Sequence, residues 1–165
     1  MVSRIASVLL VGFSLATTMS SCGYRLGYRV PADVRSIAVP ILENSTFPLR
    51  RDIEYGLTDA LRREIQTRTP LKLVDRSVAD MVVHGRILRF IEQVIAEGTQ
   101  DEVLESTITV TVRLTIEDRV NETTITKTVT DSEPFSISTG ETIDLARTRA
   151  IGNLAEKILF AIEAW

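Results

Sequence analysis

The sequence predicts an α+β fold, a two-layer sandwich in which two helices cover a mixed, mostly antiparallel sheet of about four strands. Three observations lead to this prediction. Apolar residues recur with the period of a helix in residues 51–67 and 143–165. Between them, residues 107–117 alternate strictly between apolar and polar side chains, which is typical of a strand with one buried face. Shorter apolar runs that end at turn-forming residues predict the remaining strands.

The helical segments are defined by their apolar stripes and by the residues at their ends. The first stripe consists of Ile53, Leu57, Leu61 and Ile65, each four residues after the last. The first segment ends before Pro70, because proline disfavours the helical conformation of the residue that precedes it. A capping box, Ser138 with Glu141, precedes the second segment. Its stripe comprises Ile143, Ala146, Ala150, Leu154, Ile158, Ile162 and Trp165.

The strands predicted around the first helix are short. Residues 36–41 form an apolar run interrupted by proline and are predicted to be a buried strand. Residues 43–48 are rich in turn formers and predict a loop. Residues 71–75 predict a second short strand.

Three longer strands are predicted in the second half of the chain. Residues 81–95 are largely apolar, and Gly85 within them predicts a bulge or a sharp bend. The polar residues 97–102 form a hairpin loop that leads into the alternating strand 107–117. A further turn leads to a strand over residues 123–130, where β-branched side chains favour extended structure.

Composition and charge exclude several classes of function. The 165 residues contain 19 Lys and Arg against 22 Asp and Glu, and this net charge of −3 argues against a nucleic-acid-binding protein. The chain has one Cys and one His, too few for a Cys/His zinc site or a disulfide framework. We therefore predict a protein that is not an enzyme and has no catalytic residues, metal or cofactor. His84, within an apolar strand, is predicted to be a half-buried strand residue.

The N-terminus has the pattern of a secretory signal. Residues 1–21 open with Met1-Val2-Ser3-Arg4, a short basic start, and their apolar run from Ile5 to Met19 is shorter than the roughly 20 residues that span a membrane as a helix. Met19-Ser20-Ser21 directly before Cys22 resembles the lipobox of bacterial lipoproteins, in which the cysteine receives a lipid and becomes the new N-terminus. The alternative is an ordinary signal peptide followed by a free thiol. We expect residues 1–21 to be a signal peptide and Cys22 to be the site of lipid attachment.

The mature chain divides into a tether and a domain. Residues 22–35 form the lipidated N-terminus and a tether, and residues 36–165 form the α+β domain. Several short motifs in this order after a lipobox resemble the LptE family of lipopolysaccharide-assembly lipoproteins. The motifs are Cys22-Gly23-Tyr24-Arg25, Ser36-Ile37-Ala38-Val39-Pro40, Glu43-Asn44-Ser45-Thr46, Leu71-Lys72-Leu73-Val74-Asp75 and Ala79-Asp80.

This resemblance implies both a fold and a function. Members of the family are outer-membrane lipoproteins with two helices packed on a four-stranded sheet. They sit as a plug inside the β-barrel protein LptD, help that barrel to assemble, and bind lipopolysaccharide. The resemblance therefore implies an outer-membrane, lipid-anchored protein whose domain faces the periplasm or the barrel lumen. It also implies LptD as the partner, with lipopolysaccharide as a further ligand.

Five arginines are candidates for contact with an anionic lipid or a partner. No Lys or Arg lies between Arg89 and Arg113, so the hairpin loop in that interval offers no basic contact. The candidates lie on the neighbouring strands and on the first helix, and they are Arg86, Arg89, Arg113, Arg62 and Arg63. The alternative is that each is a solvated charge balanced by nearby acidic residues.

A second functional class fits part of the pattern. The opening strand, the helix and a strand that ends in Asp75-Arg76 also resemble the N-terminal domain of TolB and the LpoB type of activator of penicillin-binding proteins. Such a protein would be a periplasmic lipoprotein that regulates an envelope enzyme. The tether of about a dozen residues favours the LptE interpretation, because it would reach only about 40 Å when extended.

Overall fold

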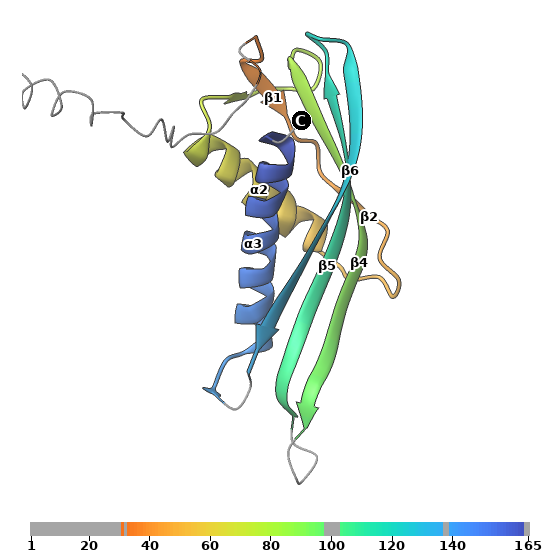
Figure 1. Ribbon diagram of the computed structural model, residues 1–165, viewed down its shortest axis with the longest axis vertical. Coiled ribbons are helices and arrows are strands. Elements are labelled where there is room, and N and C mark those ends of the chain that lie inside the picture. Colours follow the sequence, from red (N-terminus) through yellow and green to blue (C-terminus); the bar gives the residue numbers. More distant parts are fainter. Residues whose placement is uncertain (1–30, 32, 98–102, 137–138, 164–165) are drawn as a thin grey trace, which may run out of the picture.

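A mixed sheet forms one layer of the molecule, and two helices pack on one of its faces (Figure 1). The structure is a computed structural model that describes residue 31 and residues 33–97, 103–136 and 139–163. Within these residues the sheet has six strands. The strands are β1 (Ser36–Ala38), β2 (Glu43–Asn44), β3 (Lys72–Leu73), β4 (Met81–Glu97), β5 (Val103–Asp118) and β6 (Thr123–Phe135), and the helices are α2 (Ile53–Arg68) and α3 (Ile143–Glu163).

The sheet order is β3-β1-β4-β5-β6, and β2 pairs with β4 beyond the end of β1. The short strands β1, β2 and β3 make parallel pairs, whereas β4, β5 and β6 form a long antiparallel meander. The α+β class and the mixed sheet are therefore confirmed. The prediction of about four strands is too low. The segments predicted to be strands correspond to β1, β3, β4, β5 and β6, whereas β2 lies in a segment predicted to be a loop, because it is a two-residue strand that exists through pairing with β4.

The core lies between the inner face of the sheet and the helices. The alternating apolar side chains of β5 are all buried, as their period predicts. The predicted stripe of α2 is buried from Leu57 onward, and that of α3 is buried from Ala146 to Ile162. The buried side chains of β5 that face the helices are Ile108, Val110, Val112, Leu114 and Ile116.

Gly85 has a different role from the one predicted. The pairing of β4 with β5 is regular at Gly85, which lies opposite Leu114, and the nearest bulge falls between Ile87 and Arg89. A Cβ on Gly85 would lie 2.7 Å from Cγ of Leu42, so glycine is required here by the close approach of the segment between β1 and β2. The predicted bulge thus lies further along the strand than the glycine that suggested it.

The start of α3 also differs in detail. Ser138 of the predicted capping box lies outside the described residues. In the structure Thr142, directly before the helix, accepts the Leu145 N–H through Oγ1 at 3.3 Å, which is the arrangement of an N-cap residue. Glu141 instead pairs with Arg149 of the helix and with the Ser136 N–H.

Candidate functional site

The face of the sheet turned away from the helices is the candidate functional site, and we call it the open face. In Figure 1 both α2 and α3 lie on the other side of the sheet. Near the start of β4 the open face is covered by the 74–80 segment, where Ala79 packs with Ala38 and Val82. Beyond that segment the side chains of β4, β5 and β6 on this face are exposed or half-buried. They are His84, Arg86, Arg89, Ile91 and Gln93 on β4, Thr107, Thr109, Thr111, Arg113, Thr115 and Glu117 on β5, and Thr124, Thr126, Thr128, Thr130, Ser132 and Pro134 on β6.

Three of the five candidate arginines meet in the middle of this face. Arg86 of β4 lies directly opposite Arg113 of β5, and Arg89 lies opposite the neighbouring Thr111. Arg86 is compensated by Glu43 of β2, whose Oε2 lies 2.8 Å from its guanidinium. Among the described residues, Arg89 and Arg113 have no ion-pair partner. Like charges directly opposite one another on a sheet repel, so this arrangement favours an anionic group that lies over both strands.

A shallow depression of about 200 Å³ lies within this arginine cluster. Arg86 and Arg113 form two of its walls, and Glu43 and His84 contribute to it. His84 is half-buried, as predicted. The depression offers donors to an anionic or hydroxyl group at the surface.

The two helix candidates are not part of this cluster. Arg62 donates from Nε and Nη2 to the Val39 carbonyl oxygen, at 3.1 and 2.7 Å, and so fixes the chain after β1 to α2. Arg63 is exposed on α2, in the opposite layer. Of the five arginines that the sequence analysis names as candidates, three therefore lie on the open face and two lie on the helix layer.

Hydroxyl side chains form two parallel rows beside the arginines. The Thr109 and Ser132 hydroxyls lie 3.0 Å apart across the β5–β6 pair, and those of Thr111 and Thr130 lie 3.1 Å apart. Each hydroxyl has one proton and two lone pairs, so these pairs keep capacity for a further partner. The rows therefore form a flat, uncharged surface that can accept and donate hydrogen bonds.

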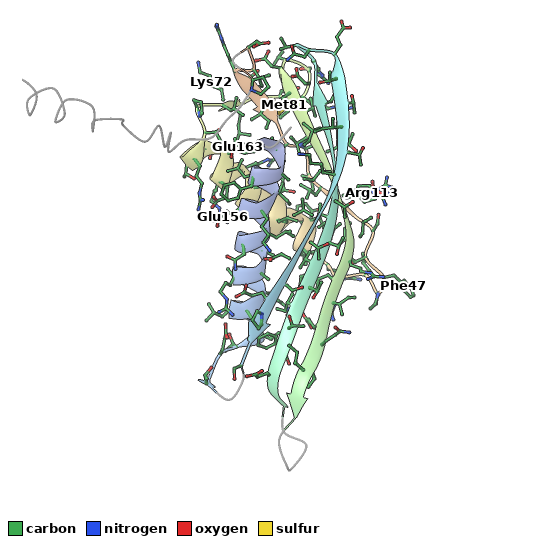
Figure 2. All side chains as sticks on the ribbon, viewed as in Figure 1. Phe47, Lys72, Met81, Arg113, Glu156 and Glu163 are labelled. Carbon is green, nitrogen blue, oxygen red and sulfur yellow. The ribbon has the colours of Figure 1, made fainter. Side chains whose placement is uncertain are left out.

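The 45–50 loop borders the open face and is the part of the site that the sequence did not single out. Figure 2 shows Phe47 on the same side of the sheet as Arg113, away from the helices. The Phe47 side chain is 100% exposed, and that of Leu49 is 61% exposed. The only indication in the sequence was a run of turn formers that contains one aromatic residue.

At one end of the sheet, hydrogen bonds tie Arg35 and Ser36, at the start of β1, to the loop before β4. Asp80 Oδ2 accepts the N–H groups of Arg35 and Ser36 at 3.0 and 2.9 Å, and Ser36 Oγ accepts the Asp80 N–H at 3.0 Å. These hydrogen bonds lower the pKa of Asp80 below its ordinary value. The bond from the Arg35 N–H has the largest effect, and the bond with the Ser36 side chain has the next largest. These contacts fix the end of the sheet at which the chain enters β1.

Cys22 and residues 23–30 and 32 of the predicted tether lie outside the described residues. Within the part of the chain that is described, no helix combines the length and apolar character needed to cross a bilayer. That same part contains no group of three or more His, Cys, Asp or Glu side chains arranged to hold a metal ion.

A family model described as lipopolysaccharide assembly, LptE, matches residues 34–162. The chain belongs to the LptE family. The match covers every strand of the sheet and both described helices except the final residue of α3. No curated protein sequence matches the chain at a significant level.

Solved structures with the same fold come from several bacteria. A protein of Xanthomonas campestris superposes with a TM-score of 0.57 at 11% identity, covering 83% of this chain and 90% of its own. An uncharacterized lipoprotein B of Nitrosomonas europaea gives 0.52 at 13% identity, covering 84% and 91%. A minor lipoprotein of Acinetobacter baumannii gives 0.51 at 17% identity, covering 79% and 94%. These likenesses show the fold, and with the family they make the chain a small lipoprotein of LptE type.

Proposed function

We propose that the protein is a lipid-anchored outer-membrane component of the machinery that transports and assembles lipopolysaccharide. In this proposal it acts by binding, as the plug and assembly partner of the LptD β-barrel. Residues 1–21 are removed as a signal peptide, Cys22 carries the lipid, and residues 22–35 tether the domain. The observation that carries the proposal is the open face, which combines hydroxyl rows with two arginines that have no ion-pair partner among the described residues, in a chain of the LptE family.

The two parts of the open face suit two kinds of contact. The hydroxyl rows on β5 and β6 match a polar protein wall, because each hydroxyl gains a hydrogen bond without the cost of burying a charge. Arg89 and Arg113 match phosphate or carboxylate groups, which guanidinium binds through two parallel hydrogen bonds. We propose the strand arginines, rather than Arg62 and Arg63, as the contacts for lipopolysaccharide or for acidic groups of the barrel.

Co-purification tests the proposal. The full chain with a C-terminal tag is isolated from cell envelopes in mild detergent, and stoichiometric partners are identified by mass spectrometry. The proposal predicts an outer-membrane β-barrel recovered one to one. Recovery of a cell-wall synthase without a barrel would contradict it and would favour the regulator function instead.

The lipid anchor has a separate test. Cys22→Ser removes the thiol that would carry the lipid, and the variant is expected to move from the membrane fraction to the soluble fraction. A variant that stays as tightly bound to membranes as the wild type would contradict the anchor. Two or three acyl chains make the predicted difference large, because each buried CH₂ contributes about 0.8 kcal/mol to membrane binding.

A further inference from the structure

The 45–50 loop presents an aromatic side chain that the domain itself does not use. Phe47 is fully exposed, and Leu49 is 61% exposed two residues later. Burial of a large apolar side chain is among the strongest contributions to protein association, so an aromatic residue held in solvent is available to a partner. Isolated exposed apolar residues are common, however. What distinguishes Phe47 is that hydrogen bonds hold its loop in place.

The loop is held by a network of side chain to backbone hydrogen bonds. Asn44 Oδ1 accepts the Thr46 N–H and hydroxyl at 3.2 and 2.8 Å, and Asn44 Nδ2 donates to the Arg50 carbonyl at 2.5 Å. Thr46 is buried, and its Oγ1 accepts the Arg50 N–H at 3.0 Å. The loop is thereby closed on itself across Phe47.

The same loop is joined to the rest of the fold from both ends. The Ser45 N–H donates to the Ile87 carbonyl oxygen of β4 at 2.9 Å. Arg50 reaches Glu92 of β4 at 3.3 Å, and Glu92 also accepts from Arg147 of α3 at 2.7 Å. Because the backbone on both sides of Phe47 is fixed, a partner that binds it loses little conformational entropy in doing so.

The position of the loop joins Phe47 to the open face. In Figure 2 Phe47 projects beyond the sheet on the side where Arg113 lies. The contact of Ser45 with Ile87 brings the loop next to the β4 residues that follow, which include Arg89. A partner that covers the hydroxyl rows and the arginines therefore meets Phe47 at the border of the same surface.

We propose that Phe47 is an anchor residue for a protein partner, inserting into an apolar pocket whose rim carries carboxylates that meet Arg89. The inference rests on the proposed function, since the partner it names is the β-barrel that the open face contacts. Phe47 supplies buried apolar area at the border of the interface, and the hydroxyl rows supply the polar part. This combination of an aromatic anchor and a polar surround is the usual anatomy of a specific protein interface.

The chemistry of the surrounding surface favours a protein over the other two occupants. A lipid bilayer would bring hydrocarbon to the threonine hydroxyls beside Phe47, and hydrocarbon offers them no hydrogen-bond partner. A second copy of the chain, docked symmetrically through this face, would bring the arginine cluster against its own copy and add repulsion. A protein wall with acidic and hydroxyl groups satisfies both parts of the surface.

Matched substitutions in the tagged full chain test the inference. Phe47→Ala is expected to lower the recovery of the barrel from envelopes at least tenfold, and Phe47→Leu, which keeps an apolar side chain, is expected to stay within about threefold of the wild type. Because Phe47 is fully exposed, neither change removes a contact within the domain. Phe160, 55% exposed on α3 in the opposite layer, provides the control, and Phe160→Ala is expected to leave recovery unchanged.

Photocrosslinking identifies the occupant. Benzoylphenylalanine placed at position 47 is expected to crosslink in intact cells to the same barrel protein that co-purifies, and at position 160 it is not. Crosslinks from position 47 only to lipid or to a second copy would overturn the inference, as would full recovery of the barrel with Phe47→Ala. If the wild type recovers no barrel, the proposed function fails together with the inference. If wild type and Phe47→Ala recover it equally, only the inference fails.

Discussion

The two faces of β5 belong to the same strand but have different neighbours. On the inner face every alternate residue from Ile108 to Ile116 is apolar and buried against the helices. On the open face the intervening residues are three threonines and an arginine, with no layer above them among the described residues. The inner face therefore determines the fold, whereas the open face is available to bind a partner. Substitutions on the two faces should affect different measurements.

The largest effect is expected on the inner face. Leu114 is fully buried on β5 between the sheet and the helices, and Leu114→Ala should lower the free energy of unfolding by about 2–5 kcal/mol because it leaves a cavity. Its neighbour on the open face provides the control, and Thr115→Ala should change stability by no more than about 0.5 kcal/mol. Urea denaturation of the purified protein measures both. Equal losses would contradict the division between the two faces.

A smaller loss is expected where the segment between β1 and β2 crosses the inner face of β4. Gly85→Ala should destabilise the protein by about 1–3 kcal/mol, since the new Cβ would lie 2.7 Å from Leu42 Cγ and force the packing apart. A Cβ added to Gly152 of α3 would meet no neighbouring group within 4 Å. Gly152→Ala should instead stabilise by about 0.5–1 kcal/mol through helix propensity. Thermal denaturation of the two variants distinguishes close packing from a general effect of adding a methyl group.

On the open face the expected effect is on binding. Arg113→Glu removes a positive charge and adds a negative one in the middle of the arginine cluster, so binding of the purified protein to immobilised lipopolysaccharide should weaken about tenfold at low salt. Arg63→Glu makes the same change of charge on α2 and should have little effect. Both variants should keep wild-type stability. Equal weakening by both variants would show that net charge, rather than the open face, governs the interaction.

The smallest effect concerns the acid stability of the end of the sheet where the chain enters β1. Because hydrogen bonds lower the pKa of Asp80 in the folded state, its contribution to stability is present above the unfolded pKa of about 3.9 and is lost as pH falls through the lower folded value. Asp80→Asn should reduce this part of the pH dependence without changing the hydroxyl rows. Denaturation curves measured between about pH 5 and pH 2 test the prediction. A variant with the same acid sensitivity as the wild type would contradict it.

The sequence predicted the inner face better than the open face, for a physical reason. Burial imposes a period, and the period identified β5, the stripes of both helices and the α+β class. It could not identify β2, which is two residues long and owes its extended structure to pairing with β4. Strand β6 was predicted to end at Thr130 but continues to Phe135, because an edge strand tolerates Pro134 opposite Thr107.

The candidate site was predicted only in part because it depends on tertiary placement. The hairpin separates Arg86 and Arg89 of β4 from Arg113 of β5 in sequence, and the strand register brings the three together. Arg62 is also an arginine, yet its guanidinium donates hydrogen bonds to the Val39 carbonyl oxygen within the domain. Phe47 lies in a segment with no periodicity, so its exposure could not be predicted from its neighbours.

The most direct test of the account is the accessibility of the open face in the cell envelope. Since the chain has a single cysteine, which is expected to carry the lipid, a cysteine introduced by Thr128→Cys on β6 or by Gln66→Cys on α2 would be the only free thiol. Maleimide labelling is compared between intact envelopes and the purified, partner-free protein. We expect the Thr128→Cys variant to be labelled at least tenfold more slowly in envelopes, and the Gln66→Cys variant to be labelled equally in both preparations. Equal labelling of the Thr128→Cys variant in both preparations would contradict the claim that the open face is the docking surface.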